Sequence, residues 1–303
     1  MTRKRQLVQP PLTDDEARTE ALSMAGAFFQ RRVAAAFRGR APWRVVAEEY
    51  PVEFPREGPL PQRETSAIDV WVAAVAPYGG VGRNPALSCQ IECKKADPGF
   101  TDWVFFRKHG TPLRFRHLTV HRLENEPALV LHEWNLTELL CDDGRELKGN
   151  YRGLDRTRST SSRIQDAARQ AALATLSTAF TLMQAPVEPF GDRRAVQLVP
   201  VVVTTANLLL CEFPLDQVDF ASGQLPATAA SYSATDYVVY DYPLTSGLSV
   251  PTDRIGFADG TAGATGGDLE ELVKMHVLIV NSSRGLHRLV SEVYPLGVLI
   301  QSW

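Results

Sequence analysis

The stretch from Ala195 to Phe213, AVQLVPVVVTTANLLLCEF, is the most apolar part of the chain and restricts its fold more than any other segment. It is rich in β-branched residues, and its apolar positions are continuous instead of alternating with polar ones. A strand with this pattern is covered on both faces, as in parallel sheets that have helices on each side. The stretch therefore predicts an α/β protein with a strand buried between two layers.

Two other segments are patterned as amphipathic helices that can supply those layers. The first begins at a capping box of Thr13 and Glu16 and continues to about Phe37. Its apolar residues recur at three- and four-residue spacing, which predicts a buried stripe of Leu22, Ala25, Phe29, Val33 and Phe37. The second helix opens at Ser162, and its small residues favour close packing on a sheet: Ala168, Ala171, Ala172, Thr175 and Ala179.

Charged residues interrupt two strand-like segments that lie between these helices. ETSAIDVWVAAV carries Asp69, and SCQIECKKA carries Glu92 and Lys94. Side chains alternate along a strand, so Ile68 and Val70 should face one layer while Asp69 faces the other. Charges in a sheet are costly unless they bind something. Two carboxylates beside an ammonium group suit Mg²⁺ or Mn²⁺, whereas a solvated salt-bridge cluster is the plainer alternative.

Asp69, a loop, and then Glu92-Cys93-Lys94 resemble the signature of the PD-(D/E)xK nuclease superfamily, the restriction-endonuclease-like fold. The resemblance implies that Asp69 and Glu92 are metal ligands and that Cys93 contributes its backbone carbonyl. Lys94 would be the catalytic lysine that orients or activates the attacking water. Some members add a glutamate from the first helix, a position that Glu20 would occupy. Proline does not precede Asp69, although the family name would place one there.

The same resemblance implies an order of elements and a division of the chain. The order is helix, three strands, helix and strand, in a three-layer core with a central mixed sheet flanked by helices. It would extend the match over residues 13–210, after a mobile basic arm at residues 1–12. Residues 211–303 would form an accessory α+β region packed on the core. Members often place a polar residue of the second helix near the site, for which Gln165 and Gln170 are candidates.

The charge distribution separates the two ends of the chain. The net charge is −3, but residues 195–303 hold 4 Lys/Arg and 11 Asp/Glu, while residues 1–194 hold 28 and 24. A basic loop leading into the second helix could contact phosphates. Its candidate nucleic-acid-binding residues are Arg152, Arg156, Arg158 and Arg163. Aromatic and basic residues between positions 100 and 117 fit either base stacking or a half-buried hairpin.

Location and partners follow from what the sequence contains. The first residues have no apolar signal region, and no apolar run is long enough to span a bilayer, so a cytoplasmic protein without membrane contact is expected. The dispersed cysteines indicate neither disulfides nor a zinc site: Cys89, Cys93, Cys141 and Cys211.

The function expected from these features is a Mg²⁺- or Mn²⁺-dependent phosphodiesterase acting as a DNA endonuclease, with RNA as the other substrate. By analogy it would serve restriction or anti-phage defence. The alternative is a nuclease-fold nucleic-acid-binding module that is inactive until a protein partner activates it, with the C-terminal region as the docking surface. The sequence is also compatible with a homo-oligomer. The motifs GxSxG, GxGxxG and HExxH of other common enzymes are absent from the sequence.

Overall fold

The computed structural model describes residues 13–15, 26–56, 62–75, 86–96, 101–107, 115–122, 127–134, 140–147, 162–184, 190, 195–226, 228–243, 255–257 and 274–292. The helices are α2 (Gly26–Phe37), α3 (Ser162–Gln184) and α5 (Arg284–Glu292), with a short 3-10 turn at Leu215–Gln217. The strands are β1 (Trp43–Arg56), β2 (Gln62–Val75), β3 (Ala86–Lys94), β4 (Asp102–Arg107), β5 (Phe115–Arg122), β6 (Pro127–Trp134), β7 (Leu140–Leu147), β8 (Ala195–Thr204), β9 (Asn207–Glu212), β10 (Ser231–Thr235), β11 (Tyr237–Pro243), β12 (Ile255–Phe257) and β13 (Lys274–Asn281).

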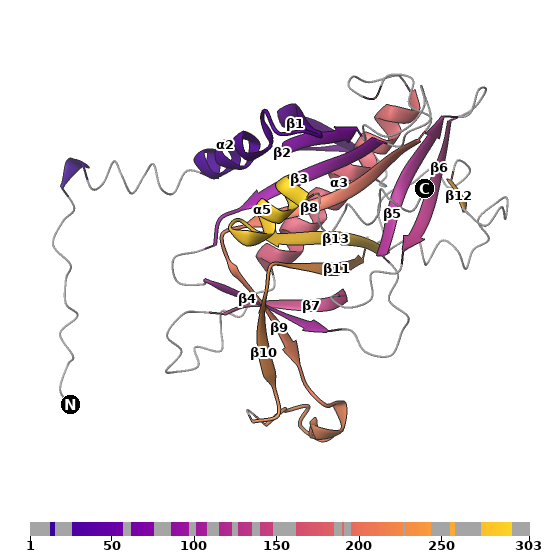
Figure 1. Ribbon diagram of the computed structural model, residues 1–303. Helices are drawn as coiled ribbons and strands as arrows, with labels where there is room; N and C mark the ends of the chain where they lie inside the picture. Colours follow the sequence, from indigo (N-terminus) through magenta and orange to yellow (C-terminus); the bar gives the residue numbers. More distant parts are fainter. Residues whose placement is uncertain are drawn as a thin grey trace.

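These strands form one mixed sheet, which confirms the α/β class (Figure 1). The main path has the order β1-β2-β3-β8-β13-β11-β7-β4-β9-β10, and β5, β6 and β12 form a side branch. Strands β1, β2 and β3 are an antiparallel meander, and β8 pairs parallel with β3. Between α2 and α3 the chain forms seven strands, β1–β7, so four strands stand between β3 and α3 where the expected order of helix, three strands, helix and strand has none.

The centre of the sheet is β8, whose residues from Val196 to Thr204 are all buried. Along one side it pairs with β3, and along the other its partner changes from β5, up to Leu198, to β13, from Val201. Pro200 lies at this change of partner. Proline has no N–H to donate. At position 200 the backbone N–H of any other residue would point to the side away from β3, into the gap between the end of the β5 pairing and the start of the β13 pairing. A proline in a central strand therefore removes no sheet hydrogen bond here.

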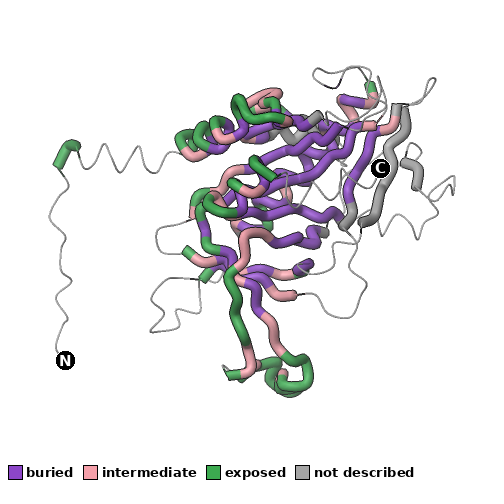
Figure 2. The backbone as a smooth tube through the Cα atoms, in the orientation of Figure 1, coloured by how far each residue is buried: buried purple, intermediate pink, exposed green. Residues whose placement is uncertain are grey.

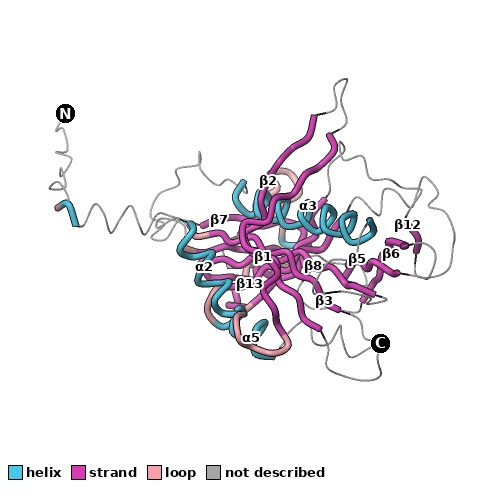
Figure 3. The backbone as a smooth tube through the Cα atoms, turned by 90° about the horizontal axis from the view of Figure 1, so that it is seen from above, coloured by secondary structure: helices cyan, strands magenta, loops and turns pink. Residues whose placement is uncertain are grey.

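Helices cover both faces of the sheet (Figure 3). Helix α3 packs on one face, where its buried alanines contact β3 and β8 and allow the close approach that the sequence predicted. Helices α2 and α5 pack on the other face through Val33, Phe37 and Leu289. Figure 2 shows the buried backbone concentrated in the central strands between these layers. The core thus has the three layers expected from the continuous apolar strand.

Several expectations are confirmed and others need correction. The stripe of the first helix is confirmed at Val33 and Phe37, whereas Leu22 and Ala25 lie outside the described residues, as does the basic arm. The single apolar run is divided at Thr205–Ala206 into β8 and β9, which belong to different parts of the sheet.

Two of the three aromatic residues of β4, Trp103 and Phe105, are core residues. Trp103 and Phe105 are buried against α3 and its neighbours, so they cannot stack on bases. The C-terminal strands β11 and β13 lie inside the sheet between β8 and β7. Among the described parts of the chain, none of the helices is both long enough and apolar enough to cross a membrane.

Replacing Gly285 in α5 with alanine should destabilise the fold. A Cβ at this position would lie 2.2 Å from the backbone oxygen of Asp236, so backbone must move. Overpacking of this kind costs about 1–3 kcal/mol, which urea unfolding would detect as a lower midpoint at unchanged slope.

The matched control is Gly26→Ala in α2, where an added Cβ meets nothing within 4 Å. This variant should match the wild type or gain up to about 1 kcal/mol from helix propensity. Equal midpoints for the two variants would contradict the packing of α5 against the turn at Asp236.

Candidate metal centre

The register of β2 and β3 brings the two sequence-predicted acids together. The last pair of the ladder is Val70 opposite Ile91, so the next step places Asp69 opposite Glu92. The backbone N–H of Cys93 donates a hydrogen bond to Oδ2 of Asp69 at 2.7 Å. Directly opposite residues of antiparallel strands have neighbouring side chains. The two carboxylates therefore share one site, as the strand pattern predicted.

Lys94 completes the cluster from the end of β3. Its Nζ lies 2.7 Å from Oε1 of Glu92, and it donates a hydrogen bond of 2.8 Å to Oε1 of Gln170 in α3. The side chains face α3, because Gln90, two residues before Glu92, accepts a hydrogen bond from Thr175 of that helix. Of the two glutamines proposed from the sequence, Gln170 is at the site, whereas Gln165 hydrogen-bonds to Tyr240.

The backbone around Asp69 is irregular, which the sequence did not predict. Glu49 in β1 lies opposite Asp69, between the pairs Glu48–Val70 and Tyr50–Ile68, and has φ 52°. This left-handed conformation is uncommon for a residue other than glycine. The side chain of Gln30 in α2 donates a 2.8 Å hydrogen bond to the backbone oxygen of Asp69. Helix α2 therefore holds the strand at the point where its pairing with β1 is disturbed.

Because of the same irregularity, two side chains of β2 do not face the layers that the sequence predicted. Ile68 packs with Leu173 and Ala174 of α3, whereas Val70 packs in the opposite layer. The expectation that Ile68 and Val70 face one layer is wrong, because the alternation is interrupted next to Asp69. Figure 3 shows that the β1–β2 hairpin extends past α3. The site therefore lies where the pairing of β2 with β3 ends.

Burial dominates the electrostatics of the two acids. Glu92 is only 4% exposed, and this burial, followed by repulsion from Asp69, raises its pKa to about 7 against the opposing effect of Lys94. Burial is also the first cause that raises the pKa of Asp69, and the charge of Glu49 adds to it. The Cys93 N–H and Lys94 act in the opposite sense. A cation between the two carboxylates would relieve their mutual repulsion.

Cys93 can contribute an oxygen but not a thiolate. Burial raises the pKa of its thiol well above the ordinary value, and the side chain packs in the α2 layer, away from the acids. In a β-strand the N–H and C=O of one residue point toward the same neighbouring strand. Because the Cys93 N–H points to Asp69, its carbonyl lies on that side as well.

The described residues contain no group of three or more His, Cys, Asp or Glu side chains that could hold a metal ion. The site brings together two carboxylates, those of Asp69 and Glu92, beside the backbone of Cys93. Glu20, Arg152, Arg156 and Arg158 lie outside the described residues, and Arg163 is half-buried in the first turn of α3. Sequence reasoning missed Gln30, and it did not select Glu49. The capping and periodicity of a helix give no signal for a contact such as that of Gln30.

Comparisons with protein-family models, with curated proteins and with solved structures found no significant match to this chain. The function must therefore be argued from the residues at the centre and from their geometry.

The buried acid should make stability depend on pH in metal-free buffer. The folded state binds the Glu92 proton more tightly than the unfolded chain does, because the pKa rises from 4.5 to about 7 on folding. The free energy of unfolding should then fall by about 3 kcal/mol as pH rises through that range. Glu92→Gln should remove this loss, so that the variant is more stable than the wild type at pH 8 but not at pH 4.5.

Urea unfolding across this pH range in the presence of a chelator measures the effect. Glu292→Gln, which removes an exposed carboxylate on α5, is the control and should follow the wild-type profile. If the free energy of unfolding changed with pH in the same way in Glu92→Gln and in the wild type, burial of the Glu92 carboxylate would not be the cause of the loss of stability.

Proposed function

We propose that this protein is a metal-dependent nuclease that hydrolyses phosphodiester bonds, with DNA as its substrate. The observation that carries the proposal is the convergence of Asp69, Glu92 and Lys94 on one partly buried site. Carboxylates and an ammonium in a sheet are unfavourable without a ligand, and they fit a divalent cation and a phosphate. The site thereby supports a phosphodiesterase over a solvated salt-bridge cluster, since Glu92 is buried.

The order of elements adds support for the PD-(D/E)xK resemblance. The acids and the lysine lie on the second and third strands of an antiparallel meander, which is preceded by α2 and followed by α3 and the parallel strand β8. Apart from the four strands β4–β7 before α3, this order agrees with the one that the resemblance implies, which supports the proposal. We therefore propose a restriction-endonuclease-like core, with β4–β7 as an insertion before α3.

Asp69, Glu92 and the carbonyl of Cys93 would hold Mg²⁺ or Mn²⁺, which prefer oxygen ligands. When bound, the metal would polarise the scissile phosphate and lower the pKa of a bound water. The protein contributes a rigid setting, because the Cys93 N–H fixes the Asp69 carboxylate and α2 fixes its backbone. Because burial raises the pKa of Glu92 to about 7, and also raises the pKa of Asp69, cation binding should strengthen as pH rises and both acids lose their protons.

Lys94 would orient the attacking water and offset negative charge that develops on the phosphate. Its ammonium group is held between Glu92 and Gln170, and therefore points into the site instead of into solvent. Gln170 acts as a positioning residue, since it contacts the lysine and not the acids. By analogy, a nuclease of this kind would act in restriction or anti-phage defence in the cytoplasm.

Alanine at Asp69, Glu92 or Lys94 should abolish DNA cleavage, with a fall of at least about 100-fold in rate per substitution. Plasmid and linear DNA incubated with Mg²⁺ or Mn²⁺ measure the loss, and circular dichroism verifies the fold. Metal titration followed by thermal unfolding separates the roles. Mn²⁺ should stabilise the wild type and Lys94→Ala, but not Asp69→Ala or Glu92→Ala.

Retained cleavage by any of the three variants would refute the assignment. Wild-type protein that binds DNA but does not cut it with either metal would favour the partner-activated module instead.

Gln170→Ala should lower kcat about tenfold while leaving the KM for DNA unchanged, because the lysine loses the acceptor that directs its ammonium group. Gln165→Ala is the matched control, since that side chain is exposed on the same helix and bonds to Tyr240. Single-turnover cleavage with Mn²⁺ distinguishes the two variants. An equal loss for both, or a change in KM alone, would contradict the positioning role.

A further inference from the structure

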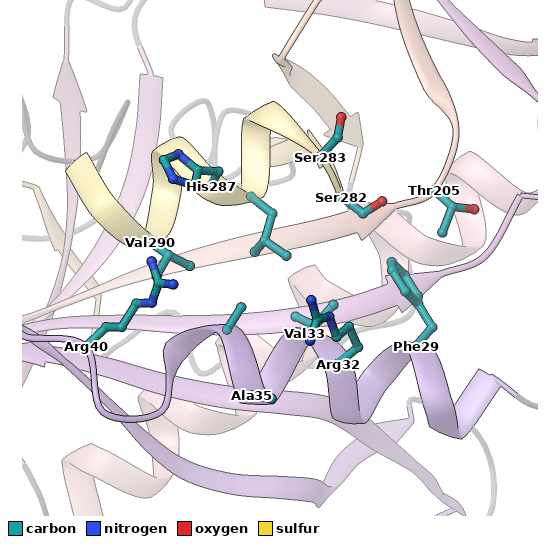
Figure 4. Close-up of a pocket in the computed structure, with 12 residues that line it drawn as sticks. Phe29, Arg32, Val33, Ala35, Arg40, Thr205, Ser282, Ser283, His287 and Val290 are labelled. Atoms are coloured by element: carbon teal, nitrogen blue, oxygen red, sulfur yellow. The ribbon is translucent and has the colours of Figure 1, made fainter.

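A groove lies between α2 and α5 on the face of the sheet opposite α3 (Figure 4). Its volume is about 460 Å³, within the range of pockets that bind small ligands or parts of larger ones. The floor is apolar and includes Val33 and Leu286. The polar lining residues are Arg32, Arg40, Thr205, Ser282, Ser283 and His287.

One end of this groove adjoins the candidate metal centre. Thr205 lines the groove, and its backbone N–H donates a hydrogen bond of 3.2 Å to the backbone oxygen of Lys94. Phe29 also lines the groove and precedes Gln30, whose side chain bonds to the backbone of Asp69. Figure 4 places Phe29 and Thr205 together at this end, Arg32 in the middle and Arg40 at the far end.

The groove and the candidate metal centre meet at the carboxyl ends of the parallel strands. β3, β8 and β13 run parallel and end at Lys94, Thr204 and Asn281. The backbone N–H of Ser282 donates to the oxygen of Thr204 at 2.7 Å, which continues the row of adjacent strand ends. Ligands of open α/β sheets bind in crevices at the carboxyl ends of parallel strands. The groove extends along this edge, from the centre toward α5.

The groove is positively charged. None of the residues that line it is an aspartate or a glutamate. Within the described ranges, neither Arg32 nor Arg40 has a carboxylate partner, and Arg40 only donates a long hydrogen bond of 3.5 Å to Ser291. By contrast, Arg38, directly after α2, pairs with Glu48, and Arg284 at the start of α5 pairs with Asp236. The groove therefore carries two arginines and none of the carboxylates that would offset their charge.

We propose that the groove binds the sugar–phosphate backbone of the substrate strand next to the scissile phosphate. This inference rests on the proposed nuclease function and adds a substrate-binding surface to it. Arg32 and Arg40 would contact different phosphates along the strand, and the hydroxyls of Ser282 and Thr205 can donate to phosphate or sugar oxygens. The apolar floor would receive the sugars. Such contacts position a strand without reading its sequence.

The test is DNA binding by the full chain, measured by fluorescence anisotropy with a labelled duplex and a labelled single strand. Ca²⁺ replaces Mg²⁺ so that affinity is read without turnover. The double variant Arg32→Gln/Arg40→Gln should raise Kd about tenfold or more at low salt. It should also reduce the salt slope of log Kd by about 2, because two phosphate contacts are lost.

The matched control is Arg31→Gln, which removes an exposed arginine of α2 that does not line the groove. It should leave both Kd and the salt slope near the wild-type values. Urea unfolding of all variants verifies that these surface changes leave the fold intact.

Two outcomes would contradict the proposal that the groove binds the substrate strand. One is an unchanged Kd and salt slope in the double variant. The other is saturation by a mononucleotide, blocked by the double substitution, with no effect of that substitution on DNA affinity. Asp69→Asn separates the two hypotheses, since it should bind DNA through an intact groove without cutting it. A wild-type protein that never cuts DNA refutes the proposed nuclease function. A wild-type protein that cuts DNA, together with a double variant that binds DNA as tightly, refutes only the proposed role of the groove.

Discussion

The hydrogen bond from the Cys93 N–H to the Asp69 carboxylate is the interaction on which the candidate centre depends. It forms where the β2–β3 ladder ends, so the backbone of one strand fixes a side chain of the other. The same register places Glu92 beside Asp69 and brings the Cys93 carbonyl to the same side. A slip by one residue would turn these side chains to the opposite face. The three oxygen groups therefore depend on one register.

That register is itself held by the layers on either side of the sheet. Gln30 of α2 binds the Asp69 backbone from one face, while Gln170 of α3 binds Lys94 from the other. The strained backbone at Glu49 leaves Asp69 without a regular partner in β1, and the glutamine of α2 takes that place. Unusual backbone conformations persist where surrounding contacts define them, and they concentrate at functional sites.

The centre and the groove occupy the two faces of one sheet edge, and β8 joins them. Its end lies between Lys94 and Ser282 in the row of parallel strand ends. The change of partner at Pro200 lets β13, from near the C-terminus, pair next to the end of β8. The C-terminal part of the chain thereby supplies α5 and one wall of the groove.

The sequence by itself indicated two amphipathic helices and a strand covered on both faces, because periodicity and apolar continuity report local burial. It identified the strands of Asp69, Glu92 and Lys94, and it indicated Gln170 as one of two candidates. Only the tertiary structure decided the contact of Gln30, the strain at Glu49, the division between β8 and β9, and the groove between α2 and α5. Each of these depends on segments far apart in the chain, and a local pattern carries no information about which distant segment packs against it.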